Sequence, residues 1–125
     1  DYCASTGGDM GKASLAYGRG KIINAAALYN TLALDGVWLD FRDPDGCREE
    51  TLYVKSMGFK GRFAIHPDQI KPIHDAYRPT LEELEWAKGV LEEAKTAGSG
   101  AFKYQGKMVD APVLAVARLI ISRED

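Results

Sequence analysis

The chain has 125 residues, of which 46% are hydrophobic, and its 16 basic and 18 acidic side chains give a formal net charge of −2. That length and composition predict a globular protein with an apolar core. The charges are interspersed, so the sequence offers no basic patch for nucleic acid or for a membrane surface, and no apolar run approaches the ~18 residues that a membrane span needs.

The cysteines and the amino terminus give expectations about the cellular context. Cys3 and Cys47 are far apart in the chain and belong to no Cys-x-x-Cys or Cys/His cluster. No secretory signal precedes them, so we expect free thiols in a reducing cytoplasm. The chain opens at Asp1 without a start methionine or a targeting pattern, which suggests a cut chain rather than a natural beginning.

The first part of the chain is predicted to hold a loop followed by a helix. Residues 1–12 are small, polar and glycine-rich, which is typical of a loop. Apolar residues then fall mostly on one helical face, but Gly18 and Gly20 weaken the beginning of this pattern. The sequence therefore predicts a secure helix only over residues 21–32.

Two short apolar runs are predicted to be parallel strands. The first, residues 36–41, is stopped by Arg-Asp-Pro-Asp-Gly, and the second, residues 62–65, ends at His-Pro. Residues 47–57 between them predict a helix, which Gly58 closes as its C-cap. This alternation indicates a βαβα segment over residues 34–78 with a right-handed crossover. Because an open strand pair leaves exposed edges, the chain alone is not expected to close a barrel.

The second half predicts helices and a hairpin. Pro72 is expected to open a helix with Ile73, Ala76 and Tyr77 turned inward, and the sequence Thr-Leu-Glu-Glu at 80–83 fits the capping box of a long helix. A hairpin is predicted about Gln-Gly within residues 101–110, and an amphipathic helix over 112–122. The packing residues expected after the capping box are Leu84, Ala87, Leu91, Ala94, Phe102, Tyr104, Met108, Val113, Val116, Ala117, Ile120 and Ile121.

Three blocks of sequence carry a family resemblance. They read Asp-Gly-Val-Trp-Leu-Asp-Phe-Arg-Asp at 35–43, Gly-Phe-Lys-Gly-Arg-Phe-Ala-Ile-His-Pro-Asp-Gln-Ile at 58–70, and Gly-Lys-Met-Val-Asp-Ala-Pro at 106–112. In this order they resemble the carboxyl-terminal portion of the citrate lyase β-subunit/malyl-CoA (citramalyl-CoA) lyase family, with its HpcH/HpaI aldolase-type barrel. The resemblance implies an α/β fold, with residues 1–78 as the C-terminal βα units of a TIM (β/α)8 barrel and residues 79–125 as a helix–hairpin–helix extension.

The resemblance also implies a chemistry. In that family, Mg²⁺ is bound by a glutamate and an aspartate, the metal chelates a 2-hydroxy or 2-keto acid, and a thioester enolate is made or released by retro-Claisen chemistry. A hard cation prefers carboxylate oxygens and stabilises charge that develops on oxygen. The implied cofactor is therefore Mg²⁺, the implied substrate is an acyl-CoA thioester, and the implied assembly is a homo-oligomer, either a trimer or a hexamer.

Two aspartates are candidates for the site. Asp1, in Asp-Tyr-Cys-Ala-Ser, resembles the family's metal-binding aspartate, whereas without the resemblance it is a frayed terminal acid. Asp110 is by its position an N-cap before Ala-Pro. The resemblance makes Asp110 the catalytic group that moves a proton in a neighbouring subunit's site, and both roles are compatible because a cap fixes the direction of the carboxylate.

The Ile65-His66 pair follows the second predicted strand. His66 has a reference pKa suited to a general base, and a histidine beside proline at a strand end is also commonly a structural group. The resemblance instead assigns Ile65 and His66 to the acyl-CoA binding surface. Asp40 and Asp43 fit turn geometry better than a metal site.

Several other residues are assigned structural or surface positions, or weaker binding roles. His74 is expected at the surface, and Trp38 and Trp86 in packing. Basic residues near the first helix are candidates for contacts with CoA phosphates, although the Gly-Arg-Gly there is too short for a phosphate loop. These residues are Lys12, Arg19 and Lys21.

Three functions remain open on the sequence. The first is a Mg²⁺-dependent lyase that cleaves a malyl-, citramalyl- or citryl-CoA type thioester. The second is a related thioester hydrolase that directs water at the same bond. The third is a non-catalytic module that mediates assembly through the long helix and the hairpin. Product analysis separates the first two, and an upstream glutamate ligand and CoA loop separate both from the third.

Overall fold

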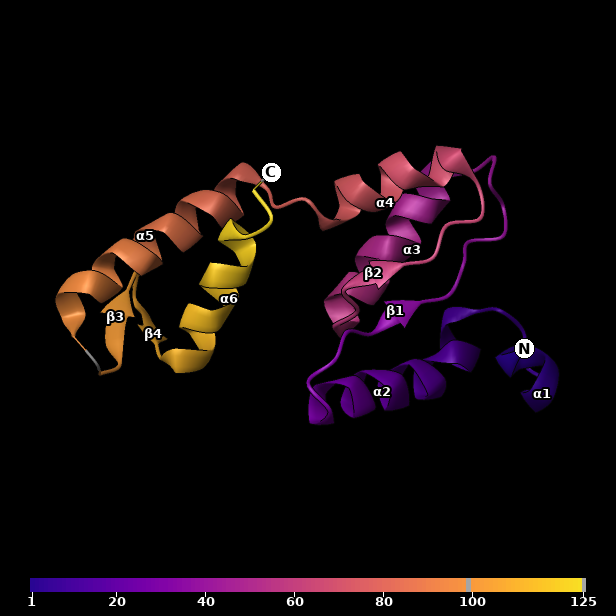
Figure 1. Ribbon diagram of the computed structural model, residues 1–125, viewed down its shortest axis with the longest axis horizontal. Coiled ribbons are helices and arrows are strands. Elements are labelled where there is room, and N and C mark those ends of the chain that lie inside the picture. The colour runs from indigo at the N-terminus through magenta and orange to yellow at the C-terminus, as the bar shows by residue number, and fades with distance from the viewer. Residues whose placement is uncertain (99, 125) are drawn as a thin grey trace. The chain divides into compact units, whose positions relative to one another are not determined.

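The computed structural model describes residues 1–98 and 100–124, and the chain forms two compact units, Asp1–Tyr77 (unit 1) and Arg78–Asp125 (unit 2) (Figure 1). Unit 1 holds α1 (Tyr2–Thr6), α2 (Lys12–Leu28), β1 (Leu34–Asp35), α3 (Pro44–Met57), β2 (Gly61–Arg62), a 3-10 turn η1 (Pro67–Gln69) and α4 (Ile70–Tyr77). Unit 2 holds α5 (Leu81–Ala97), β3 (Phe102–Tyr104), β4 (Lys107–Val109) and α6 (Ala111–Ile121). Within this part of the chain no helix is long and apolar enough to cross a membrane.

The two strands of unit 1 pair in parallel, as predicted. Leu34 lies opposite Gly61 and Asp35 opposite Arg62. The predicted bounds were wrong. The first strand was predicted at residues 36–41, but β1 already ends at Asp35. The run from Gly36 has no ladder partner among the described residues, so its β propensity is not expressed as a strand. No barrel closes within residues 1–98 and 100–124, since each of their two sheets has two strands.

The helices at the amino terminus differ from the prediction. Residues 2–6 are helical rather than a loop, and α1 ends at Gly7, whose φ of 73° is left-handed. Helix α2 begins at Lys12 and continues through both of its glycines. A Cβ at Gly18 would lie 3.0 Å from the ring of Tyr2, so glycine allows α1 to pack closely on α2. This packing offsets the low helix propensity of glycine. The helix then ends at Leu28, two residues before the left-handed Asn30.

The later helices of unit 1 follow the sequence more closely. Asp43 caps α3 by accepting from Gly46 N at 2.9 Å, and Gly58 ends it with a φ of 117°, as predicted. Helix α4 begins at Ile70 rather than at Pro72, because proline is tolerated within the first turn, where the amides lack helical partners. Ala26, Ala33, Val54 and Phe59 form the apolar core, against which Ile23, Tyr53 and Met57 pack.

Unit 2 is built on local signals that the sequence carries. Thr80 Oγ1 accepts from Glu83 N at 3.1 Å while Thr80 N donates to Glu83 Oε2 at 2.8 Å, which confirms the capping box. Strands β3 and β4 are antiparallel about Gln105 and Gly106, with φ values of 46° and 80° that suit a two-residue hairpin.

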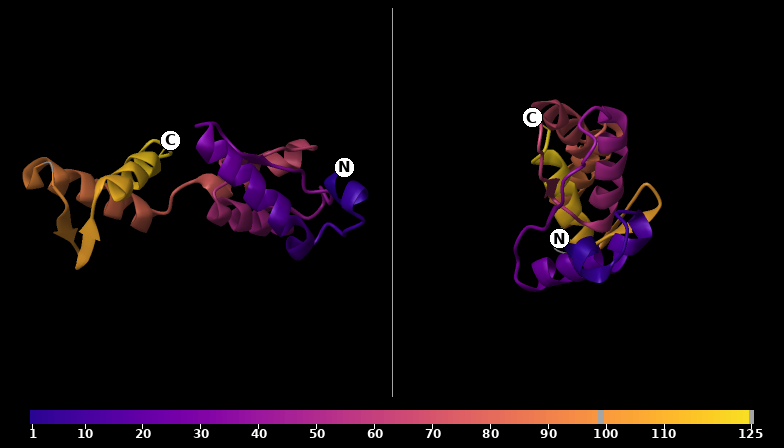
Figure 2. Two further views of the ribbon diagram at one scale, coloured as in Figure 1. Left: turned by 90° about the horizontal axis from the view of Figure 1, so that it is seen from below. Right: turned by 90° about the vertical axis from the view of Figure 1, so that its right-hand side faces the viewer.

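The core of unit 2 is apolar and lies between its two helices and the hairpin (Figures 1 and 2). Its buried members are Ala87, Val90, Val109 and Ala117, with Phe102 and Tyr104 among the residues packed against them. The prediction of Met108 and Val116 as packing residues was wrong, since they are 74% and 51% exposed. Met108 lies opposite Lys103, and alternation along the strands puts this pair on the face away from the core.

Candidate active site at the strand ends

The carboxyl ends of the two parallel strands hold a network of buried charges. Asp35, the last residue of β1, accepts from Arg19 Nε at 3.0 Å and from Arg19 Nη2 at 2.9 Å, and its Oδ2 also accepts from Arg62 Nη2. Arg62 is the last residue of β2. Glu50 of α3 adds a second carboxylate, whose Oε1 lies 2.9 Å from Arg19 Nη1 as an ion pair. One network thus joins α2, α3 and both strands.

The charged state of this network follows from its contacts. Burial by itself would lower the pKa of the Arg19 guanidinium, but hydrogen bonds and attraction to Asp35 and then Glu50 outweigh burial and raise the pKa. Arg62 Nη1 lies 3.5 Å from Thr51 Oγ1, while Arg62 Nε is buried without a partner among the described residues. Beneath this network, burial raises the pKa of the Cys47 thiol, which is therefore protonated and unreactive near neutral pH.

Ile65 and His66 lie just beyond the end of β2. Ile65 is 54% exposed, and its amide donates to Gln69 Oε1 at 2.9 Å. His66 caps the 3-10 turn, with Nδ1 accepting from Asp68 N at 3.2 Å. Its ring stacks on Phe41 at a centroid distance of 4.6 Å. The main chain and the rings of this segment are therefore held in place, while a role in binding substrate stays a prediction.

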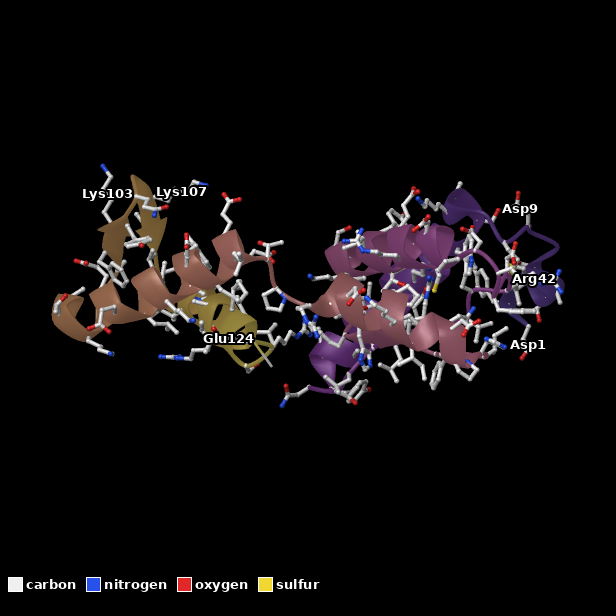
Figure 3. All side chains as sticks on the ribbon, turned by 90° about the horizontal axis from the view of Figure 1, so that it is seen from above. Asp1, Asp9, Arg42, Lys103, Lys107 and Glu124 are labelled. Carbon is white, nitrogen blue, oxygen red and sulfur yellow. The ribbon has the colours of Figure 1, made fainter. Side chains whose placement is uncertain are left out.

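Asp1 lies at the amino terminus on a cavity of about 420 Å³. Gly36 and Val37, which follow β1, line the same cavity, and Figure 3 labels Asp1 at the end of unit 1 where Arg42 also lies. Asp1 is exposed and makes no side-chain bond that caps α1. Asp35 also lines the cavity, but two arginines hold its carboxylate. Among the described residues no group of three or more His, Cys, Asp or Glu side chains is placed to hold a metal.

The basic candidates for CoA phosphates are mostly engaged elsewhere. Arg19 is 6% exposed and bound to carboxylates, which contradicts an exposed phosphate-binding role in this unit. Lys12 Nζ lies 3.6 Å from both Glu49 and Glu50 and 4.8 Å above the ring of Tyr53. Lys21 lies over Tyr17. None of these contacts provides a phosphate site.

Asp110 occupies the predicted cap position in unit 2. Its Oδ1 accepts from Val113 N at 3.3 Å, in the first turn of α6, and the residue is exposed. The capping role is confirmed. Because the residue is exposed, other groups can reach it, and a role in proton transfer stays a prediction. Asp40 and Asp43 serve turn geometry as expected, with Asp40 Oδ1 accepting from Arg42 N at 3.0 Å.

Sequence reasoning missed the residues that join the strand ends. Asp35, Glu50, Arg62 and Gln69 are all buried, and none was a candidate on the sequence. A signal for two of them existed: Asp35 and Arg62 are charged residues inside otherwise apolar runs, and a charge that interrupts a buried strand requires a partner. For Glu50 and Gln69, which lie on helical segments, the pattern offered no comparable signal.

Comparison with known proteins agrees with this architecture. A family model described as C-C bond lyase of the TIM-barrel fold matches residues 20–124. Citramalyl-CoA lyase, mitochondrial, of Rattus norvegicus is 36% identical over 127 residues, covering 98% of this chain and 38% of that protein. The citrate lyase subunit beta of Escherichia coli K12 is 38% identical over 114 residues, covering 89% of this chain and 38% of that protein. This chain thus spans less than half the length of these curated relatives.

A solved structure extends the likeness to three dimensions. Protein CitE from Mycobacterium tuberculosis, in complex with magnesium, acetoacetate and coenzyme A, superposes with a TM-score of 0.83 at 36% identity, covering 98% of this chain and 48% of that one. Because the family model matches 105 of the 125 residues, from 20 to 124, this chain belongs to the C–C bond lyase family of the TIM-barrel fold.

Proposed function

We propose that the protein containing this chain is a Mg²⁺-dependent carbon–carbon lyase that cleaves a 2-hydroxyacyl-CoA thioester into an acyl-CoA and a keto acid. The observation that carries the proposal is the match over 98% of the chain to a structure bound to magnesium, acetoacetate and coenzyme A. Acetoacetate is a keto acid and coenzyme A the thiol carrier, so the ligands of that protein resemble both products of such a cleavage.

The donor chemistry at the strand ends fits magnesium in part. Mg²⁺ is bound in proteins by one or two carboxylates together with water and substrate oxygens. Asp1 supplies one accessible carboxylate at the cavity beside Gly36 and Val37. When bound, the metal supplies positive charge for the oxygens of the hydroxy or keto acid. We assign Asp1 as the metal ligand from this chain.

The remaining roles belong to the chain's own residues. The Ile65-His66 segment is proposed to bind the acyl-CoA, since its backbone is anchored while the Ile65 side chain stays exposed. In the cleavage the substrate hydroxyl loses its proton and becomes the carbonyl of the keto acid as the carbon–carbon bond breaks. The electron pair of that bond forms the thioester enolate, which is then protonated at carbon. Asp110 is proposed to move the proton at the hydroxyl or the enolate carbon, because its cap bond to Val113 fixes the direction of the carboxylate.

We further propose that the protein is a cytoplasmic homo-oligomer, a trimer or hexamer, in which Asp110 serves a neighbouring subunit's site. Cys3 and Cys47 are free thiols, which is compatible with a reducing compartment. Light scattering on the purified protein tests the assembly. Mixing Asp110→Asn subunits with Asp1→Asn subunits tests the shared site, because only an aspartate acting across subunits restores part of the activity in mixed oligomers.

The activity is tested by product analysis. The protein expressed from its complete reading frame is incubated with malyl-CoA or citramalyl-CoA and Mg²⁺, and acetyl-CoA and glyoxylate or pyruvate are measured. Release of these products supports the lyase, and removal of Mg²⁺ by a chelator should abolish it. Release of free CoA with the intact hydroxy acid instead identifies a thioester hydrolase. If the protein is folded and releases neither set of products, the non-catalytic assembly module is the remaining function.

The 125-residue chain alone provides the matched control. It holds one proposed metal ligand, and no barrel closes within the residues that the structure describes. We therefore expect no lyase turnover from the isolated chain under conditions in which the complete protein is active. Robust glyoxylate or pyruvate release by the isolated chain would contradict the assignment of the site to a complete barrel.

A further inference from the structure

One buried side-chain amide joins the two segments that leave the parallel strands. Gln69 is 1% exposed. Its Nε2 donates to the main-chain oxygen of Trp38 at 2.6 Å, and its Oε1 accepts from Ile65 N at 2.9 Å. Trp38 and Ile65 lie three residues beyond the last paired residues, Asp35 and Arg62. Both polar ends of the amide are therefore used, one on each segment.

This amide continues the sheet beyond its last rung. Regular pairing stops at Asp35 and Arg62, and the final backbone bond between the two segments runs from Phe63 N to Asp35 O at 3.2 Å. A side-chain amide carries the same donor and acceptor groups as a peptide unit. Where the segments are no longer paired directly, the Gln69 amide takes the place of a peptide between them and satisfies one backbone group on each.

Gln69 also holds the residue after Ile65. The main-chain N–H of Gln69 donates to the main-chain oxygen of His66 at 3.0 Å. Gln69 therefore contacts the main-chain N–H of Ile65 through its side chain and the carbonyl of His66 through its backbone. On the other segment, Phe41 stacks on the His66 ring. The position of the Ile65-His66 peptide is thus set from both sides, and the polar contribution comes from Gln69.

We propose that Gln69 is a positioning residue for acyl-CoA binding, which holds Ile65 and His66 in register with the segment after β1. The inference rests on the proposed function in assigning acyl-CoA as the ligand. Gln69 is buried and acts through Ile65 and His66 rather than by touching substrate. Loss of its two bonds leaves the amide of Ile65 and the carbonyl of Trp38 without these partners, so the segment shifts to find others. A displaced binding segment weakens ligand binding more than it slows the chemical step.

The test compares two substitutions to methionine in the protein expressed from its complete reading frame. Gln69→Met preserves length and apolar volume but removes both bonds. Lys55→Met is the matched control, because Lys55 Nζ also ties two segments of unit 1 by donating to a main-chain oxygen, that of Ala76 at 3.1 Å. Both variants are expected to melt at a lower temperature, and they should differ in ligand binding.

The readout is the split between KM and kcat, together with the dissociation constant for coenzyme A by calorimetry. Gln69→Met should raise KM for the acyl-CoA and the dissociation constant about tenfold or more with a nearly unchanged kcat, because a loss of binding that is equal in the ground state and the transition state raises KM alone. Lys55→Met should leave both constants at their original values. Unchanged constants in folded Gln69→Met, or an equal rise in Lys55→Met, would overturn the proposal.

Two further measurements keep the test decisive if Gln69→Met does not fold. Gln69→Leu also removes both bonds with a smaller apolar side chain, and it should raise both constants as well; original values in folded Gln69→Leu overturn the proposal. Hydrogen exchange of the Ile65 amide in the unsubstituted protein should be slow although the Ile65 side chain is exposed, and fast exchange overturns the proposal too. Absence of CoA binding by the unsubstituted protein would refute the proposed function, and the exchange measurement would still decide whether Gln69 orders this segment.

Discussion

The two units of this chain solve the problem of a stable interior in different ways. Unit 1 buries six polar or charged residues at or beside the ends of its parallel strands: Arg19, Asp35, Glu50, Thr51, Arg62 and Gln69. In unit 2 the buried residues that the structure describes are apolar, namely Ala87, Val90, Val109 and Ala117. The difference indicates that unit 1 combines its apolar core with a buried polar centre, whereas unit 2, over its described residues, has an apolar core alone and presents Asp110 on its surface.

This difference has an energetic consequence. A buried ion pair adds little net stability compared with well-packed apolar residues. Removing one partner, however, leaves the other charge buried and unpaired, which is strongly destabilising. An apolar core responds to changes in volume instead. Loss of a buried charge should therefore destabilise unit 1 in particular, whereas unit 2 should respond mainly to changes in core volume. The two tryptophans, Trp38 in unit 1 and Trp86 in unit 2, allow each unit to be followed by fluorescence in single-tryptophan variants.

The largest stability effect is expected at Asp35. Asp35→Ala leaves the guanidinium groups of Arg19 and Arg62 buried together without the carboxylate that both now contact. The free energy of unfolding of unit 1 should fall by about 3–5 kcal/mol, the usual cost of breaking a buried pair from one side. Urea denaturation in a Trp86→Phe background, followed by Trp38 fluorescence, measures this change.

The control replaces Asp35 together with the two arginines that contact it. Arg19→Met, Asp35→Leu and Arg62→Met together remove the stranded charges, so most of the lost stability should return, while Glu50 keeps its ion pair with Lys12. A triple variant as unstable as Asp35→Ala would show that packing volume, rather than charge, governs this centre. In a Trp38→Phe background, the urea unfolding transition of unit 2, followed by Trp86 fluorescence, should be the same in all these variants.

A second comparison uses two N-cap aspartates, one in each unit. Asp110→Asn retains a good cap residue and removes the acid, so turnover of the complete protein should fall about 10²-fold or more, in the range of general acid–base catalysis, with little change in Tm. Asp43→Asn is the matched control, since Asp43 caps α3 in the same way through Gly46 N. Its turnover should stay at the original level.

The outcome separates capping from chemistry. Steady-state kinetics with the acyl-CoA substrate and thermal melting of both variants give the two quantities needed. Normal turnover in Asp110→Asn would reduce Asp110 to a cap, worth at most about 1 kcal/mol of stability. Equal losses of turnover in both variants would point to a general dependence on capped helices rather than to a proton-transfer role for Asp110.

The sequence predicted unit 2 better than unit 1 because the signals of unit 2 are local. The capping box needs only Thr80 and Glu83, and the hairpin needs only the two turn residues at 105–106. The parallel pairing of unit 1 was predicted correctly in kind, but its strands were placed too late. A strand exists only where a neighbouring chain pairs with it, and an apolar run does not say where that neighbour stops.

The same reasoning explains which site residues were found. Asp110 was recognised as a cap because its partner, Val113, is three residues away. Gln69 binds Trp38, 31 residues away, and Arg62 binds Asp35, 27 residues away. Such contacts depend on how the helices and strands pack together, which composition and periodicity do not specify. The sequence could therefore mark Asp35 and Arg62 as charges that need partners, but the partners themselves were visible only in the structure.

The smallest expected effect contrasts two glycines inside helices. Gly20 in α2 has no atom within 4 Å of an added Cβ, so Gly20→Ala should stabilise unit 1 by roughly 0.5–1 kcal/mol through helix propensity alone. At Gly89 in α5 an added Cβ would lie 1.9 Å from the hydroxyl oxygen of Tyr104 and 2.7 Å from its ring carbon Cζ. The ring must move, and overpacking of this kind costs about 1–3 kcal/mol.

Gly89→Ala should therefore destabilise unit 2 even though alanine is the better helix former. Double substitution with Tyr104→Ala removes the obstructing ring, so the effect of alanine at position 89 should change sign in that background, which a double-mutant cycle detects. Trp86 fluorescence in a Trp38→Phe background measures the unfolding of unit 2 for all four variants. If Gly89→Ala stabilises unit 2 with Tyr104 present, the hairpin does not pack closely on α5, and the apolar core proposed to support Asp110 is looser than the structure shows.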